Sequence, residues 1–388
     1  MLNFFYMYGA MWSVILALYQ FGWSDLCIPL DAGVVFFIIF QMAVSIFLGV
    51  IFRKYFKFYK IDINPHKKKT TTVLLVLFFI LNIIYERYIP LLSVLRGNSM
   101  YASSFAGIPI LYVLVSGFAI MYAFYLMYLF ICFKEKSILI EFLIILMWFV
   151  LLFQRQNIFV IASGSLWLLV ASVDFKKISL KKKIILAVLV IIVAFVALYI
   201  FGIIGNVRYG MWDSRDASMI STLAKINNKW PSWLSKSYAW AYMYIVSPLA
   251  NLQYNVTVGE QFNAGFADFI NEILPNYITN KLGLDLNVGT QLIVSSFTAS
   301  TAFAKMYRIM GYGGIYSFFL LEILLLVIEI TYVKRLQKYF VPLCVGWGYF
   351  LLMNFFDNSM SYPITSFTIV YPLLLLFLSK VKNPFVKV

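Results

Sequence analysis

The arginines of this chain are the first candidates for functional residues. The stretch GNVRYGMWDSRD (residues 205–216) places Arg208 and Arg215 directly after a long apolar run. Arg155 lies in the short polar tip FQRQN between two apolar runs, and Arg308 lies in MYRIMGYGG. Because a guanidinium group offers a planar set of donors that matches phosphate oxygens, these four arginines are candidate ligands of a phosphate or pyrophosphate.

Carboxylates occur in the same part of the chain and supply candidate bases. Five of them lie between Arg208 and Arg308 in the sequence: Asp213, Asp216, Glu260, Asp268 and Glu272. A positioned carboxylate can accept the proton of an attacking hydroxyl group, but the sequence does not assign this role to any one of them. The structural alternative is that Asp213 and Asp216 pair with the neighbouring arginines on the surface of a loop.

Metal or cofactor chemistry is not predicted. Cys27, Cys132 and Cys344 lie in or beside different apolar segments without paired spacing, so they suggest neither a disulfide framework nor a thiolate metal site. The single histidine, His66, lies in a lysine-rich connection, and the chain has no Asp-x-Asp pair. We therefore expect a site with no metal and no cofactor.

The composition decides the class of protein that must position these residues. Hydrophobic residues make up 63% of the 388 residues, charged residues 12%, and the mean hydropathy is +0.87, which excludes a water-soluble domain. About 20 apolar residues cross a bilayer. Ten segments approach this length: 4–23, 32–51, 71–89, 108–132, 138–153, 158–173, 184–204, 311–333, 339–356 and 364–379. The first has no charged region before it and no cleavage site, so we expect a retained helix.

Lysine sets the orientation of these segments. Alternate connections hold most of the lysines: Lys54, Lys57, Lys60 and Lys67 to Lys69 with Arg53; Lys134 and Lys136; Lys176, Lys177 and Lys181 to Lys183; Lys334 and Lys338 with Arg335; and Lys380, Lys382 and Lys387. The other lysines, Lys225, Lys229, Lys236, Lys281 and Lys305, lie within 205–310. If there are ten spans, the alternate connections all lie on one side, which the positive-inside rule makes the cytoplasm, with both termini there. The net charge of +15 then reflects topology and attraction to anionic lipid headgroups, and no nucleic acid is expected as a partner.

The chain is accordingly predicted to be an all-α polytopic membrane protein in three parts. Residues 1–204 hold seven transmembrane helices, residues 205–310 form a large loop on the side away from the cytoplasm, and residues 311–388 hold three more helices and a tail. Within the loop, 217–228 favours a short helix. The stretch 230–252 starts at a proline and is rich in tryptophan and tyrosine, which is typical of helices at the membrane interface. Residues 288–314 are more polar than a span and suggest a re-entrant or interfacial segment.

Several of these residues have a structural as well as a functional interpretation. Arg155 should lie level with the outer headgroups, where an arginine needs a wet cavity or a partner, although a snorkelling or carboxylate-paired arginine is the alternative. Arg87 lies beside Glu86 and is more typical of a structural pair. Glu322 and Glu329 share one face of the eighth span by their spacing, and both a functional and a packing role stay open for them.

The layout and four short motifs resemble bacterial O-antigen polymerases of the Wzy type. These motifs are FQRQNIFV, NVRYG, YIVSPLANL and MYRIMGYGGIY. The resemblance implies polymerisation of undecaprenyl-pyrophosphate-linked oligosaccharides at the periplasmic face of the inner membrane. It also implies membrane lipids, a chain-length regulator and a flippase of the same pathway as partners. The arginines Arg155, Arg208, Arg215 and Arg308 would then bind pyrophosphate.

Three other activities share part of this layout. An O-antigen ligase uses the same type of donor and has a large periplasmic loop, but it depends on a periplasmic histidine, which this chain lacks in the predicted topology. A flippase typically has about twelve spans in two similar halves, and neither feature is present. A membrane acyltransferase needs a catalytic histidine near the membrane.

Overall fold

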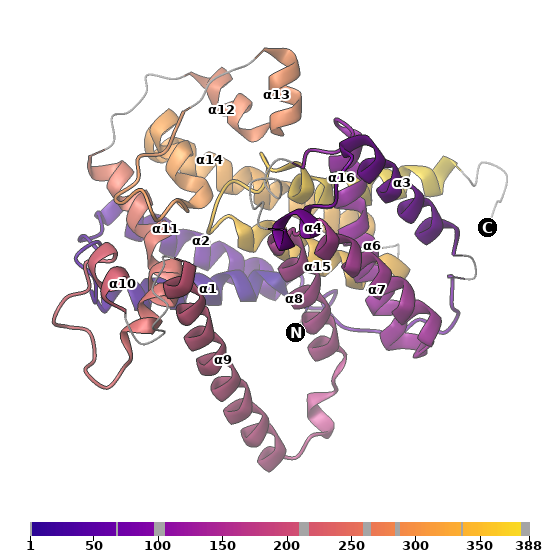
Figure 1. Cartoon of the computed structure of the whole chain (residues 1–388), viewed down its shortest axis with the longest axis horizontal. Coiled ribbons are helices and arrows are strands. Elements are labelled where there is room, and N and C mark those ends of the chain that lie inside the picture. The colour runs from indigo at the N-terminus through magenta and orange to yellow at the C-terminus, as the bar shows by residue number, and fades with distance from the viewer. Residues whose placement is uncertain are drawn as a thin grey trace.

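The structure is a computed structural model that describes residues 2–66, 69–96, 105–208, 217–258, 265–283, 288–334 and 337–381 (Figure 1). Within these ranges the chain is α-helical, and its only extended pairing is an isolated antiparallel bridge between Ser24 and Ile226. A helix coincides with each of the ten expected spans: α1 (Phe4–Gln20), α2 (Ala32–Ile51), α3 (Thr70–Glu86), α6 (Leu111–Phe133), α7 (Lys136–Leu151), α8 (Arg155–Ser172), α9 (Leu180–Arg208), α14 (Thr301–Val333), α15 (Gln337–Met353) and α16 (Pro363–Val381).

Four of these helices are long and apolar enough to cross a membrane, namely α2, α6, α9 and α14. Shorter apolar stretches occur in α3, α8, α15 and α16. The chain therefore has the architecture of a helical membrane protein, and the number of ten crossings stays a prediction. The remaining helices are short connections or lie in the long segment after α9: α4 (Pro90–Leu95), α10 (Ser218–Leu223), α11 (Ala239–Thr257), α12 (Phe266–Ile273) and α13 (Asn276–Leu282).

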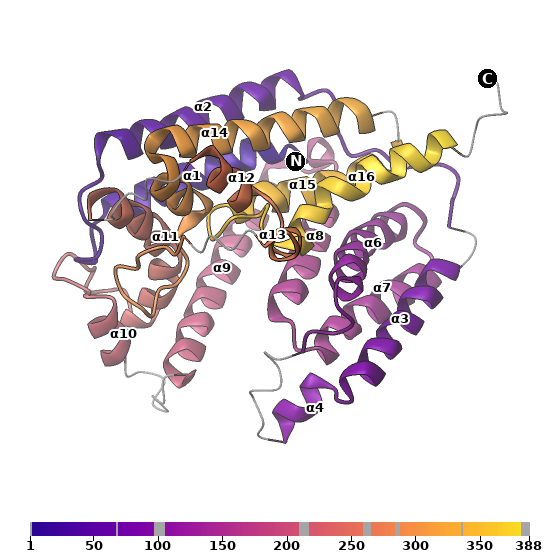
Figure 2. The same cartoon turned by 90° about the horizontal axis from the view of Figure 1, so that it is seen from above.

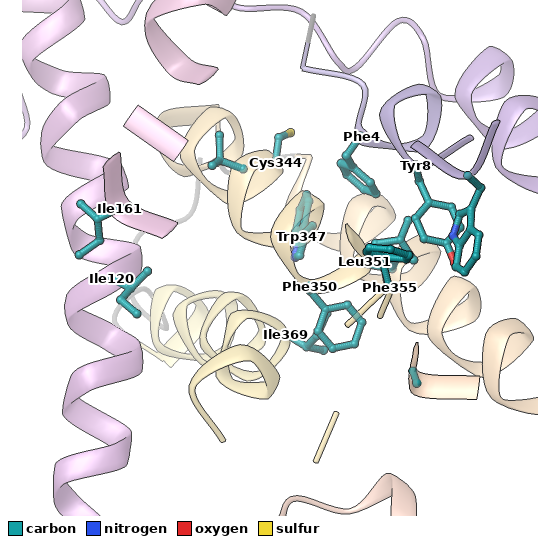
Figure 3. Packing of buried hydrophobic residues seen from close by; sticks show 14 of the residues in the cluster. Phe4, Tyr8, Ile120, Ile161, Cys344, Trp347, Phe350, Leu351, Phe355 and Ile369 are labelled. Carbon is teal, nitrogen blue, oxygen red and sulfur yellow. The ribbon is translucent and has the colours of Figure 1, made fainter. Parts of the chain in front are cut away.

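A core of aromatic side chains joins the helices. In Figure 2, α2 and α14 run side by side next to α1, and α6 lies among α7, α8, α15 and α16, which all contact it. Trp347 of α15 is completely buried and meets the ring of Phe4 at 6.4 Å between centroids (Figure 3). Tyr8 stacks on Phe319 of α14 with 6.2 Å between centroids. Burial of such large rings is the main source of close packing inside the bundle.

The two ends of the bundle differ in character. We call the end that carries α10 to α13 the cap end. There, Asp25 donates its backbone N–H to the carbonyl of Lys225 at 3.0 Å, so the connection between α1 and α2 lies on the long segment after α9. At the opposite, lysine end, the ammonium group of Lys334 lies 5.1 Å from the ring centroid of Tyr55, and Asn64 donates to Glu135 at 2.9 Å.

The helix α9 extends away from the other helices (Figure 1). None of its apolar window is buried inside the protein, so its surface suits contact with lipid. It joins the bundle near its final turns, where Gly205 packs on the ring of Trp240 and Trp240 Nε1 donates to Asn206 Oδ1 at 2.7 Å. Trp240 therefore attaches α9 to α11.

The tryptophan- and tyrosine-rich stretch differs from the expectation of an interfacial helix that starts at a proline. Pro231 forms a turn in which Leu234 donates to its carbonyl at 3.0 Å, and α11 starts only at Ala239. Most residues of α11 are buried against α1, α9 and α14. Its rings Trp240 and Tyr242 are both 5% exposed, so they fill protein interior, whereas Tyr244 is 45% exposed.

The helix α14 begins ten residues earlier than the expected eighth span and is broken inside. Met310 and Gly311 have non-helical dihedral angles, and Gly311 has φ 60° and ψ −146°, a conformation that only glycine adopts without strain. A Cβ atom on Gly314 would lie 2.2 Å from the carbonyl oxygen of Met306. The hydroxyl of Tyr312 donates to Asp31 Oδ1 at the start of α2, which fixes the direction of the second half.

We expect Gly311→Ala to destabilise the folded protein by about 1–3 kcal/mol, because alanine is strained at this φ and ψ. Gly314→Ala should also destabilise it, since the added methyl group meets backbone. Gly313→Ala is the matched control, because a Cβ atom there meets no heavy atom within 4 Å. Thermal unfolding in detergent measures all three, and equal melting temperatures for the three variants would contradict this account of the break.

Candidate functional site

The first half of α14 carries two of the cations at the cap end. Lys305 Nζ lies 2.9 Å from Glu272 Oε1 of α12, and this ion pair holds α12 against α14. Arg308 follows three residues later, which places it on the same side of the helix, and it is 6% exposed. The break at Gly311 comes directly after these residues, so the polar half of α14 stops where the long apolar half begins.

Burial dominates the protonation behaviour of Glu272. The pKa of this carboxyl is raised above its ordinary value because burial disfavours the charge, although the Lys305 ammonium group opposes the shift and nearby Asp357 adds to it. The carboxyl is thus less readily ionised than that of an exposed glutamate. The backbone carbonyl of Glu272 accepts a 2.7 Å hydrogen bond from Asn358 Nδ2, which connects α12 to the loop between α15 and α16.

That loop, residues 354–362, is anchored by two completely buried asparagines. Asn354 Nδ2 donates to Glu322 Oε2 at 2.6 Å, and its carbonyl accepts from the N–H of Ala302 at 2.8 Å. Asn358 Oδ1 accepts from the N–H of Met360 at 2.9 Å. The loop between these asparagines therefore has a fixed position beside the start of α14.

Asp357 is the carboxylate that this loop presents. The hydroxyl of Tyr362 donates to Asp357 Oδ2 at 3.0 Å. Burial and the neighbouring Asp357 raise the pKa of Tyr362 to about 12, so Tyr362 keeps its proton at neutral pH and acts as a donor. Asp357 is only partly buried, which leaves it accessible from the cap end.

Beside Tyr362 a pocket of 150 Å³ lies among α6, α8, α15 and α16. Exposed Gln156 and Tyr362 stand among its lining residues, as do the more buried Asn157 and Thr368. The polar groups of this lining are all uncharged: Gln156, Asn157, Tyr349, Tyr362, Thr365 and Thr368. Neutral amides and hydroxyls next to aromatic rings suit a neutral, hydroxylated ligand better than an ion.

The sequence-predicted arginines have the following places. Arg155 is the first residue of α8, directly before the pocket residue Gln156, and Arg208 is the last residue of α9. Arg308 lies buried in α14. Arg215 falls outside the described residues, so its role as a pyrophosphate ligand is untested.

Of the predicted bases, Asp213, Asp216 and Glu260 also lie outside the part of the chain that the structure describes. Asp268 Oδ2 accepts a 2.6 Å bond from the N–H of Gly265 and so caps the start of α12, which is a structural role. Glu272 is the predicted base that the structure brings to this site, in its ion pair with Lys305.

Two other expectations concern charged pairs. The expected pairing of Glu86 with Arg87 is not among the ion pairs of the described residues. Glu86 instead accepts hydrogen bonds from the backbone N–H groups of Gly107, at 2.6 Å, and Ala106, at 3.2 Å, and so has a structural role before α6. Glu322 and Glu329 are both buried inside the protein, with 0% and 1% exposure. The shared face predicted for them thus points into the bundle.

Sequence reasoning missed Asp357 and the neutral pocket residues. The signal was the stretch FDNSMSY (residues 356–362), a short polar connection on the same side as the predicted arginines. Its asparagines and Asp357 resemble an ordinary turn in sequence, and only the folded contacts place them beside Glu272 and Tyr362. No family model, curated protein or solved structure matches the chain, so the site rests on this geometry.

We expect Lys305→Met to lower stability by about 1–3 kcal/mol, because the buried Glu272 carboxylate then lacks its cation. A folded-state pKa above the unfolded value means that stability is greatest at low pH and falls as pH rises. Lys305→Met should therefore steepen the loss of stability as the pH rises above the ordinary pKa of a glutamate carboxyl, and adding Glu272→Gln should remove this loss. Unfolding midpoints of the single and double variants measure the effect, and a Lys305→Met variant with wild-type pH dependence would refute the coupling.

Proposed function

We propose that this chain is a surface polysaccharide polymerase that joins undecaprenyl-pyrophosphate-linked oligosaccharide repeat units. The observation that carries the proposal is the neutral pocket among α6, α8, α15 and α16, which adjoins the helix start at Arg155 and the carboxylate of Asp357. Neutral polar groups that suit a sugar, a helix that begins at an arginine, and a carboxylate held by Tyr362 support this proposal. A glycosyl transferase that uses a charged, lipid-linked donor needs these three elements.

The chemistry is a metal-independent glycosyl transfer in this proposal. A hydroxyl oxygen of the acceptor forms a bond to the anomeric carbon of the donor sugar, and the bond from that carbon to the pyrophosphate oxygen breaks. The pyrophosphate leaves with the electron pair. Arginines near the leaving oxygens stabilise their developing charge, a type of interaction worth about 3–4 kcal/mol in enzymes, and fixing both substrates lowers the barrier further.

The topology belongs to the same proposal. With ten crossings, the cap end faces the periplasm of the bacterial inner membrane, and both termini and the lysine end face the cytoplasm. Lipid-linked substrates then reach the cap end from the outer leaflet, with their pyrophosphates at headgroup depth. Arg155 and Arg208 stand at the ends of two apolar helices, where such phosphates lie.

The alternatives receive less support from the described contacts. An O-antigen ligase would need a histidine at the cap end, but His66 lies at the lysine end, where its Nε2 is 3.0 Å from Glu141 Oε2. A flippase or another transporter would use a passage through the bundle. The space between α15 and its neighbouring helices is instead packed with buried aromatic side chains. Polymerisation therefore stays the preferred function.

Deletion of the gene tests this function through the surface glycan. A polymerase mutant should carry a single repeat unit, whereas loss of all surface glycan would point to a ligase or a flippase. Restoration of the long-chain ladder by the wild-type gene completes the test.

In the same complemented strain, we expect Arg155→Ala and Arg208→Ala to abolish long-chain glycan at normal protein abundance, because each removes a phosphate ligand. Arg53→Ala is the matched control, since Arg53 is exposed at the lysine end and should leave the ladder unchanged. Full-length ladders in both test variants would remove the pyrophosphate role from these arginines.

A further inference from the structure

The pocket beside Tyr362 has the size of a site for one ring. Pockets that hold drug-sized ligands have volumes of about 300–1,000 Å³, and this one has 150 Å³. It runs from exposed Gln156 and Tyr362 to buried Thr368 and Phe124. The volume and lining of the pocket therefore fit the terminal ring of an oligosaccharide better than a ring in its middle.

The lining also separates this pocket from the charged groups around it. Phe124 and Tyr349 are stacked, with centroids 6.2 Å apart and an angle of 14° between the planes, and they form an aromatic wall. Asn157 Nδ2 donates to Gln154 Oε1 at 2.7 Å, which leaves its own Oδ1 as an acceptor for a ligand hydroxyl. A pyranose ring has an apolar face for the wall and hydroxyls for the amides, while a phosphate would find no cation among the lining residues.

We propose that this pocket binds the terminal, uncharged sugar ring of the acceptor repeat unit and that Asp357 is the general base for its attacking hydroxyl. This inference rests on the proposed polymerase function and deepens it. Asp357 stands beside the ring because Tyr362, a pocket residue, donates to its Oδ2. Tyr362 donates to Oδ2 at 3.0 Å and the N–H of Asn358 donates to Oδ1 at 2.7 Å, so both oxygens of the carboxylate are held in place. Each oxygen keeps a second lone pair that can accept from the acceptor hydroxyl.

Asp357 suits the role of base better than its neighbour Glu272. Glu272 Oε1 is paired with Lys305 Nζ at 2.9 Å, and the glutamate side chain is 12% exposed between α12 and α14, so this carboxylate serves the attachment of α12. Asp357 is partly exposed and belongs to a loop held by two buried asparagines, Asn354 and Asn358. A base needs both a fixed position and access to its substrate, and Asp357 has both.

The step balances without a further reactant. The acceptor hydroxyl oxygen bonds to the anomeric carbon of the donor as the pyrophosphate leaves with the bonding electron pair, and the hydroxyl proton moves to Asp357. The protonated carboxyl releases this proton to water after the product leaves. Tyr362 keeps its own proton throughout and acts as a positioning residue.

Two variants of the purified, detergent-solubilised protein test the inference with lipid-linked repeat units as donor and acceptor. Asp357→Asn should lower kcat roughly 100-fold or more, the range expected for loss of a general base, while acceptor KM stays unchanged. Val160→Phe places a ring into the pocket and should raise acceptor KM about tenfold without changing donor KM. Asp174→Asn is the matched control, because Asp174 is exposed at the lysine end and should behave as wild type.

The outcomes separate this inference from the proposed function. If the wild-type protein does not elongate the acceptor, the polymerase function fails. If the wild-type protein elongates the acceptor but Asp357→Asn keeps wild-type kcat, Asp357 is not the base. If Val160→Phe keeps the wild-type acceptor KM, the pocket is not the acceptor site. Thermal unfolding checks that each variant is folded, and Tyr362→Phe should shift the pH profile of kcat, which a merely structural residue would leave in place.

Discussion

Two asparagines one turn apart on α11 support the irregular backbone at the cap end. Asn251 Nδ2 donates to the carbonyls of Phe297 and Ala299, at 2.8 and 2.7 Å, and Asn255 exchanges bonds with the backbone of Gln291 at 2.7 and 3.0 Å. Both side chains are completely buried. Non-helical backbone can lie inside a membrane protein only where such partners satisfy it. These bonds fix where α14 begins, and hence where Lys305 stands relative to α12.

Much of the fold could be predicted from the sequence, because long apolar runs become helices wherever they occur. The start and the surroundings of a helix were predicted less well where protein, rather than lipid, surrounds it. Lys305 makes the start of α14 look like a loop, yet its ion pair with Glu272 allows it to lie in a helix against α12. Likewise, the aromatic residues of α11 resemble an interfacial pattern, but Trp240 and Tyr242 fill space between helices. Composition alone does not distinguish these two kinds of burial.

Some residues of the candidate site could be named from the sequence, and others only from the folded structure. The arginines became candidates because their distribution departs from that of lysine, and Arg155 and Arg208 lie at helix ends, while their role as phosphate ligands stays a prediction. Asp357 could not be found, because its significance depends on contacts with Tyr362 and on the position of Asn358, which come from tertiary structure. A neutral pocket has no sequence signature at all, since amides, hydroxyls and aromatic rings are common in every helix that faces a protein interior.

The central claim is that the cap end holds both substrates, with the acceptor sugar among α6, α8, α15 and α16. A structure of the protein with an undecaprenyl-pyrophosphate-linked repeat unit tests this claim most directly. We predict a sugar ring against Tyr349 and Asn157, with its hydroxyl toward Asp357 and a pyrophosphate near the start of α8. A ligand bound at the lysine end, in the cavity beside His66, would contradict the account.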